Sequence, residues 1–539
     1  TLGELLLGSG RSSEAETLLQ RAATGPRAYP YAALLLARYY NDTGRPTDAL
    51  TIAEPLCLAG KADAELASQH IAALVALGRP QDAVGAYQAL AANSPGNPAS
   101  AHALAYALTA TGQYEEAQRV AQHTLARGYR SAPLYSLYAR SLIAQGSLDR
   151  AEGLLRECLQ IEPRLVEAHN NLAQLIWLRT GELSQAIEML DGALQRFPND
   201  DALWAAKAAL LQGAGNPGAA YDCLAPLAAR TQASPMILVR TGLAALESNA
   251  ATAAALAERA LKLLPGSAPA RKLLVAARLG TGDAQGALTE CDILLASSPN
   301  DQYLIALQST AWRLLGDERY RQLCDYEKLV MPMQLEVPSG WADMASFLKD
   351  VQVSLSRLHN PAGHALLFQS LRHGTETTQD LSRSPDPAIR ALFNSFVTPI
   401  ERYIEHMGSG PDPLRRRRAG GWRFNGSWSV RLQPSGFHTN HVHPRGWISS
   451  ACYIDLPDCI TDTRTQEGIL TFGEPSIPTN PALWAEYSVR PAAGMLVLFP
   501  SYFWHGTLPF SGTQTRLTVA FDAVPDRERD AAASALTTL

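Results

Sequence analysis

A short pattern, Gly-x-x-x-x-Ala, recurs along much of the chain at a nearly constant interval. Successive copies lie 33 to 35 residues apart, from Gly10 to Gly316. A fixed period of this length is typical of a solenoid, in which one repeat cannot bury its apolar face alone and stacks on its neighbours. The pairs are Gly10/Ala15, Gly44/Ala49, Gly78/Ala83, Gly112/Ala117, Gly146/Ala151, Gly181/Ala186, Gly215/Ala220, Ser248/Ala253 and Gly282/Ala287, with Gly316 opening a degenerate unit.

Each repeat contains two stretches with the apolar spacing of an amphipathic helix, such as residues 131–145 and 148–161. Twelve residues after the Ala, a proline often ends the helix pair. It stands at Pro95, Pro163, Pro198, Pro265 and Pro299. Residues 1–325 therefore resemble the tetratricopeptide repeat. The resemblance implies an all-α solenoid of nine to ten repeats whose groove binds a peptide or protein; a spacer or dimerisation role is the alternative. Because the chain opens inside a helical unit, we expect a truncated first repeat or a preceding segment.

The helical period breaks at residues 326–340, where two prolines and a glycine predict an ordered linker. Helical patterns follow at residues 341–357 and 387–407, and strand patterns dominate from Trp422 onward. We therefore expect a second domain over residues 341–530 and a tail over residues 531–539. Four consecutive arginines, residues 415–418, favour a solvated loop, the alternative being a rim patch for an acidic substrate or for the solenoid.

Histidines cluster in this second domain. In a regular strand, His441 and His443 project from one face, and His505 on a neighbouring strand can supply a third imidazole to one metal ion. Imidazole suits Fe, Zn, Cu and Ni alike. His438 lies three residues before His441, which would place it on the opposite face, exposed or at a bulge.

Arg516 follows His505 by eleven residues and alternates with apolar Leu517, Val519 and Phe521. If those three face the outer packing layer, Arg516 points into the barrel, where a guanidinium needs an anionic partner. Tyr453, on the strand after the His pair, is by its type as well suited to a core position.

The order of these elements resembles the 2-oxoglutarate and Fe(II)-dependent oxygenases, and among them the prolyl-hydroxylase-like proteins and an uncharacterised bacterial and phage subgroup. The resemblance covers roughly the last 200 residues. It implies a double-stranded β-helix, or jelly roll, with flanking helices, so that the whole chain would be an α+β multidomain protein. His441 and His505 match the family's two metal-binding histidines. Arg516, with Tyr453, matches the groups that bind 2-oxoglutarate.

The sequence departs from the family pattern at His443, which stands where Asp or Glu is usual. A third imidazole leaves the Fe(II) complex one negative charge poorer. Three interpretations stay open: a three-His iron centre, a two-His centre with His443 behind it, or a fold reused for binding without metal.

From these observations we predict an Fe(II)/2-oxoglutarate-dependent dioxygenase, using O2, that hydroxylates a side chain in a peptide or protein held by the repeats. The alternatives are a non-catalytic adaptor and a three-His dioxygenase that does not use 2-oxoglutarate. Demethylation, desaturation and halogenation share such a site, so the outcome and the substrate stay open.

Composition limits the partners and the compartment. With 46 Lys and Arg against 51 Asp and Glu, the net charge is −5 and the pI near 6.2, which argues against nucleic acid as the main partner. No run of eighteen apolar residues suggests a membrane span. Seven cysteines, an odd number, favour free thiols and a cytoplasmic location.

Overall fold

The computed structural model describes residues 2–8, 11–24, 29–94, 97–359, 370–377, 379–418 and 420–526. Gly10, Pro95 and the predicted tail, residues 531–539, lie outside the described residues. Contacts divide the chain into two compact units. One comprises Thr1–Trp177 and Glu182–Leu274, and the other Leu178–Gly181 and Val275–Leu539.

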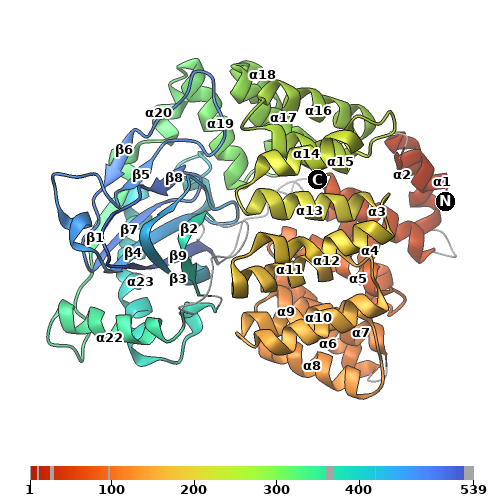
Figure 1. Cartoon of the computed structure of the whole chain (residues 1–539), viewed down its shortest axis with the longest axis horizontal. Helices are drawn as coiled ribbons and strands as arrows, with labels where there is room; N and C mark the ends of the chain where they lie inside the picture. The colour runs from red at the N-terminus through yellow and green to blue at the C-terminus, as the bar shows by residue number, and fades with distance from the viewer. Residues whose placement is uncertain are drawn as a thin grey trace, which may run out of the picture. The chain divides into compact units, whose positions relative to one another are not determined.

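The first unit is all α-helical, and its helices follow one another as antiparallel pairs (Figure 1). They are α1 (Leu2–Gly8), α2 (Ser12–Thr24), α3 (Pro30–Asp42), α4 (Pro46–Leu58), α5 (Ala64–Ala76), α6 (Pro80–Asn93), α7 (Pro98–Ala110), α8 (Tyr114–Ala126), α9 (Ala132–Ala144), α10 (Leu148–Ile161), α11 (Val166–Thr180), α12 (Leu183–Arg196), α13 (Asp201–Gly213), α14 (Pro217–Ala228), α15 (Pro235–Ala245), α16 (Ala250–Leu263) and α17 (Ala268–Thr281), which continues into the second unit.

The repeat positions have the roles expected of them. The repeat glycines from Gly44 to Gly316 turn the chain between paired helices with φ between 66° and 86°, where a side chain would be strained. The repeat alanines from Ala15 to Ala287 are at most 1% exposed. A methyl group at these positions lets neighbouring helices approach closely, and this close packing sustains the fixed period.

The second unit begins within the repeat region. It contains α18 (Ala284–Ser297), α19 (Gln302–Leu315), α20 (Arg319–Leu323) and α21 (Tyr326–Leu329). Helix α19 packs directly on the β-sheet domain: the Trp504 indole donates to Thr310 Oγ1 at 3.0 Å, and Arg313 donates to the Gly473 carbonyl at 2.8 Å. At the start of α19, the backbone amide of Gln302 donates to the Pro444 carbonyl at 3.2 Å.

Two antiparallel sheets lie at the centre of the rest of the second unit (Figure 1). The larger has the strand order β1-β7-β4-β9-β3-β2 and the smaller β6-β5-β8. This is the jelly-roll arrangement of a double-stranded β-helix, so the chain is an α+β multidomain protein. The strands are β1 (Met331–Gln334), β2 (Leu371–Glu376), β3 (Trp422–His438), β4 (Ile448–Asp455), β5 (Leu470–Phe472), β6 (Tyr487–Val489), β7 (Met495–Pro500), β8 (His505–Thr507) and β9 (Arg516–Pro525).

Two helices, α22 (Met344–Ser356) and α23 (Pro387–Met407), flank the larger sheet. Phe393 and Phe396 of α23 pack against Phe521 of β9, with the Phe396 and Phe521 rings 5.0 Å apart. Leu517, Val519 and Phe521 therefore face the outer layer, and the alternating residues of β9 face the interior of the barrel. Short helical turns occur at η1 (Leu381–Arg383), η2 (Arg415–Arg417) and α24 (Asp458–Thr461).

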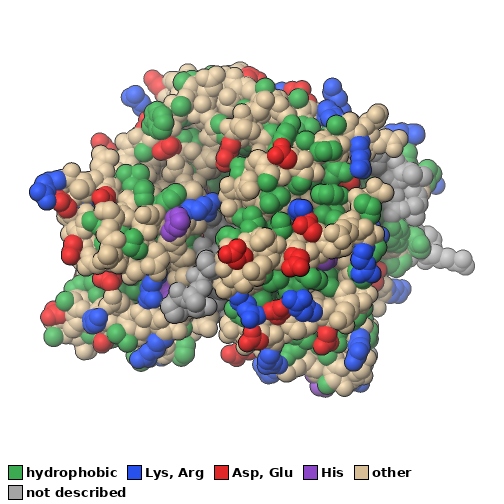
Figure 2. Space-filling view, viewed as in Figure 1, with side chains coloured by type: hydrophobic (Ala, Val, Ile, Leu, Met, Phe, Trp, Pro, Cys, Tyr) green, Lys and Arg blue, Asp and Glu red, His purple; other side chains and the backbone are tan. Residues whose placement is uncertain are grey.

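The surface carries both signs of charge. On the face shown in Figure 2, acidic and basic side chains are interspersed, in keeping with their nearly equal numbers. All seven cysteines are free, as expected. Among the described residues, no helix has the length and apolar character that a membrane crossing requires.

Candidate metal centre

Three histidines converge inside the barrel. The possible ligand atoms of His441, His443 and His505 all lie within 4.8 Å of one another, and the two Nε2 atoms of His441 and His443 are 3.3 Å apart. Within the described part of the chain, this is the one group of three or more His, Cys, Asp or Glu residues with such geometry. Three convergent imidazoles can hold a transition metal through nitrogen.

The hydrogen bonds of these rings fix which nitrogen faces the centre. Each Nδ1 lies beside an oxygen that accepts: the Thr439 carbonyl at 2.8 Å for His441, the Phe503 carbonyl at 2.9 Å for His505, and Asp522 Oδ1 at 2.6 Å for His443. The proton therefore sits on Nδ1, and the lone pair of Nε2 is directed toward the other rings. Metal-binding histidines are commonly oriented in this way.

The backbone brings the three histidines together by a different route from a regular strand. Strand β3 ends at His438, and His441 forms an isolated bridge with His505, each amide bonding the other's carbonyl at 2.9 and 3.0 Å. The His443 amide then donates to the Ser501 carbonyl at 3.0 Å. The predicted pairing of His441 with His443 is met, although the segment between them is an irregular connection.

Burial keeps two of the three rings neutral. The pKa of His441 is lowered to about 3 by burial and by His443, and burial lowers the pKa of His505 well below its usual value. Burial also acts to lower the pKa of His443, but Asp522 and Glu376 outweigh it and the pKa is raised. The site thus combines two rings that resist protonation with a third, His443, whose protonated form is stabilised by the carboxylate of Asp522.

Asp522 was not apparent from the metal-binding motif. Its carboxylate also accepts a hydrogen bond of 2.7 Å from Ser449, whose hydroxyl lies 2.8 Å from that of Ser501. Asp522 is six residues after Arg516, so the two share the inner face of β9. This even spacing is the sequence signal that could have identified Asp522.

Arg516 lies on the inner face, as predicted, and is 2% exposed. One guanidinium nitrogen donates to the Gly468 carbonyl at 3.0 Å, and no carboxylate of the described residues forms an ion pair with it. Its Nε has no hydrogen-bond partner among the described residues, and the guanidinium lies 5.1 Å from the ring centroid of fully buried Tyr453, with which it interacts. Buried donors without acceptors are costly, so this cradle suits a bound carboxylate.

His438 is not exposed, and the expected bulge is present: the pairing of β3 with β2 shifts register between Leu432 and Phe437, just before His438. It is half-buried, its ring centroid lies 5.8 Å from that of His441, and its Nδ1 is 3.0 Å from the Ser370 hydroxyl. Strict alternation of faces fails because this register shift interrupts β3 before His438. His438 borders the centre but does not belong to the three-histidine group.

The arginine run is only partly solvated. Arg417 is buried and donates to the Gly446 carbonyl at 2.7 Å, and Arg415 donates to the Met407 carbonyl at 2.7 Å. Arg418 is exposed. A surface loop is therefore the wrong description for Arg417, which braces the segment just after His443.

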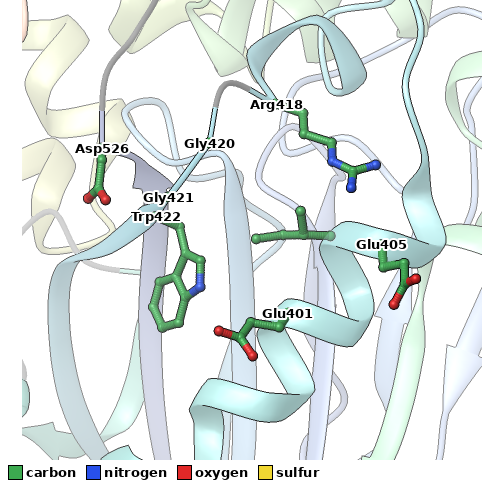
Figure 3. Close-up of a pocket in the computed structure, with 8 residues that line it drawn as sticks. Glu401, Glu405, Arg418, Gly420, Gly421, Trp422 and Asp526 are labelled. Carbon is green, nitrogen blue, oxygen red and sulfur yellow. The ribbon is translucent and has the colours of Figure 1, made fainter.

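A cavity of about 570 Å³ lies elsewhere in the second unit, beside α23 (Figure 3). Glu401, Glu405, Arg418, Trp422 and Asp526 are among the residues that line it. None of its lining residues belongs to the histidine group or to the Arg516 cradle, so this cavity is separate from the candidate metal centre.

The fold and the histidine group define a jelly-roll protein with a candidate metal centre, joined to helical repeats. A family model described as "Putative 2OG-Fe(II) oxygenase" matches residues 426–522. Two tetratricopeptide-repeat models match residues 1–55, 74–141 and 142–210. The chain is a tetratricopeptide-repeat protein that carries a 2OG-Fe(II) oxygenase domain.

Solved structures similar to the chain include repeat proteins. TTC0263, a thermophilic TPR protein of Thermus thermophilus, is 25% identical over 34% of this chain and 100% of its own, with a TM-score of 0.29. A tetratricopeptide repeat protein from Parabacteroides merdae is 13% identical over 52% of this chain and 98% of its own (TM-score 0.30). The human IFIT1 dimer with m7Gppp-AAAA is 16% identical over 60% and 79% (TM-score 0.33). No curated protein matches the chain.

Proposed function

We propose that the second unit is an Fe(II)/2-oxoglutarate-dependent dioxygenase that hydroxylates a side chain of a peptide or protein bound by the repeats. The observation that carries the proposal is the buried Arg516, which has no anionic partner among the described residues and shares the inner surface of the barrel with three convergent histidines. A dicarboxylate that reaches from the histidines to Arg516 would satisfy both features.

The residues present fit both groups. His441, His443 and His505 would hold Fe(II), and Arg516 with the Tyr453 hydroxyl would bind the far carboxylate of 2-oxoglutarate. Bound together, iron and 2-oxoglutarate supply oxidising chemistry from O2, with succinate and carbon dioxide as the co-products. The protein supplies position: the Nδ1 hydrogen bonds orient the three rings, and the Gly468 carbonyl orients the guanidinium.

Asp522 offers a physical reason why a histidine can replace the usual carboxylate ligand. The carboxylate bonds His443 at 2.6 Å and so places a negative charge one residue farther from the metal. A carboxylate that accepts from a ligand histidine makes that ligand more basic. We propose that His443 and Asp522 together perform the electrostatic role of one acidic ligand.

Each of the two alternatives leaves one feature of the barrel, either Arg516 or the three histidines, without a role. A three-His dioxygenase that does not use 2-oxoglutarate has no use for a buried guanidinium without a carboxylate partner on the inner face of the barrel. A non-catalytic adaptor has no use for three rings held with their Nε2 atoms converging. The repeats support a peptide or protein substrate, because such grooves bind extended or helical segments.

We also propose a cytoplasmic location, since all seven thiols are free.

The test is an anaerobic titration of the full chain with Fe(II) and then with 2-oxoglutarate, followed by the iron-to-2-oxoglutarate charge-transfer absorption. We expect saturable binding of one iron and appearance of the band. The matched control is 2-oxopentanoate, which has a methyl group in place of the far carboxylate and should bind far more weakly. Absence of the band with 2-oxoglutarate, or equal binding of both acids, contradicts the proposal.

A further inference from the structure

Glu376, the last residue of β2, places a carboxylate on the inner face of the barrel. It pairs across the sheet with Val430, which is 2% exposed and belongs to an apolar cluster with Leu432 and Phe510. The neighbouring Thr375 faces the other way, where its hydroxyl lies 2.9 Å from His359. Since side chains alternate along a strand, Glu376 points toward the histidines.

The Glu376 carboxylate is half-buried, and none of the described residues forms a hydrogen bond or an ion pair with it. Burial raises the pKa of Glu376 to about 7, while the proximity of His443 acts to lower it. The carboxylate is not among the atoms that lie within 4.8 Å of one another at the centre, so it is not a fourth ligand in this geometry. A desolvated acid without a partner is costly unless a ligand compensates it.

Trp428 presents an aromatic ring beside the same histidine. It precedes Val430 by two residues and therefore shares the inner face of β3. Its ring centroid lies 5.7 Å from that of His443, and the side chain is half-buried. An indole face and a carboxylate are the two groups that most favour an organic cation, the first through its quadrupole and the second through charge-assisted hydrogen bonds.

We propose that Glu376 and Trp428 form a subsite for a cationic substrate group, an ammonium or a guanidinium, next to the metal centre. The inference rests on the proposed function and narrows its substrate to a basic side chain of the lysine or arginine class. Arg516 and Glu376 carry opposite charges on the inner face of the barrel. The Arg516 guanidinium binds the anionic cosubstrate, and the Glu376 carboxylate binds the cationic group of the substrate. A cationic group would hold Glu376 as the carboxylate, whereas a neutral side chain offers it no opposite charge, so charge is the basis of selection.

The test uses n-butylguanidinium and its neutral counterpart n-butylurea with the full chain. Saturation-transfer difference NMR measures affinity in the metal-free protein, and line broadening by Mn(II) at the histidines reports whether the bound cation is near the metal. We expect the cation to bind at least about tenfold tighter than the urea, and to weaken at least about tenfold in Glu376→Gln. The control is Glu401→Gln, which removes an exposed carboxylate from α23 and should leave the cation affinity unchanged.

Equal binding of cation and urea by the wild type, or unchanged cation affinity in Glu376→Gln, overturns the subsite. Trp428→Leu gives a second readout, because loss of the indole should weaken the cation and spare the urea. The 2-oxoglutarate titration is run on the same samples. If the charge-transfer band forms but the cation is not selected, the subsite alone is wrong; if the cation is selected and no band forms, the oxygenase proposal is wrong and the subsite stands.

Discussion

His443 donates its Nδ1 proton to Oδ1 of Asp522 across 2.6 Å, while its other ring nitrogen lies 3.3 Å from Nε2 of His441. One ring thus links a buried carboxylate to the candidate metal position. Where an acidic ligand is usual, this chain has His443, and the carboxylate of Asp522 lies on the far side of the His443 ring. The negative charge of Asp522 acts on the centre through the hydrogen bond to that ring. Metal affinity should therefore depend on a residue that does not touch the metal.

Asp522→Asn should lower Fe(II) affinity about ten- to hundredfold, because the neutral amide no longer polarises or orients the His443 ring. An anaerobic metal titration of wild type and variant measures the change. Ser449→Ala is the matched control: it removes one hydroxyl contact to Asp522 and keeps the carboxylate, so its effect should be smaller. Wild-type affinity in Asp522→Asn would mean that the hydrogen bond only packs the barrel.

The ligand set is tested by comparing two neighbouring histidines. His443→Ala should lose at least ten- to hundredfold in iron affinity, since it removes a ligand from the group of three. His438→Ala should retain iron, because His438 lies outside that group and its Nδ1 is engaged with Ser370. If the two variants bind iron equally, His443 is not a ligand and a two-His centre becomes the better interpretation.

Loss of Arg516 should act on the cosubstrate and not on the metal. In Arg516→Met the far carboxylate of 2-oxoglutarate would be buried without a partner, at a cost of about 2–5 kcal/mol, so that the affinity falls by about thirtyfold or more. Tyr453→Phe removes a single neutral hydroxyl and should cost only about 1 kcal/mol. The charge-transfer titration measures both, and unchanged 2-oxoglutarate affinity in Arg516→Met would contradict the assignment.

The sequence predicts those features of this fold that depend on a repeated local pattern. The fixed period located the turn glycines and the buried alanines, and alternation along β9 placed Arg516 on the inner face and Phe521 on the outer one. Periodicity does not predict the position of a side chain where the chain leaves regular secondary structure. His438 is half-buried beside a register shift of β3 whose shape the sequence does not predict, and Arg417 is buried where it donates to Gly446, 29 residues farther along the chain.

The same limit applies to the inner wall of the barrel. Asp522 and Glu376 are ordinary acidic residues in the sequence, and only strand pairing brings β2 and β9 together, one on each side of β3. The stretch from Gln302 to Leu315 has the pattern of a repeat helix, which gives no sign that it also supports Trp504 and Pro444. Such contacts are set by tertiary structure.

Two buried histidines of the first unit make its stability depend on pH. Burial lowers the pKa of His70 and of His102 to about 4, whereas an unfolded histidine titrates near 6.5. Between these values the unfolded chain binds protons that the folded chain does not. Stability should therefore fall as the pH drops from about 6.5 to about 4, by up to about 3 kcal/mol per histidine.

Urea unfolding of the metal-free protein at several pH values, followed by helical circular dichroism, measures this loss. His102→Leu should flatten the dependence, because no hydrogen-bond partner of the His102 ring is lost with it and one proton site is removed. His123→Leu is the control, since that side chain is exposed on α8. An equal pH dependence in wild type and His102→Leu would show that His102 does not contribute.

The terminal repeat should be required for the oxygenase unit to fold. A fragment beginning at Met331 lacks α19, so it leaves the Trp504 indole and the Pro444 carbonyl without their partners and exposes the part of the sheet domain on which α19 packs. Each buried group left unpaired costs about 1–3 kcal/mol. A fragment beginning at Ala268 keeps α17 to α21 and should fold and bind iron. Thermal unfolding and iron titration of both fragments make the comparison, and equal iron affinity would mean that the last repeat is dispensable.

The longer fragment then tests the role of the earlier repeats. If these repeats recruit the substrate, the fragment should consume 2-oxoglutarate slowly yet lose most of kcat/KM on a protein substrate. The reason is that a groove contributes binding energy only to a ligand that reaches it.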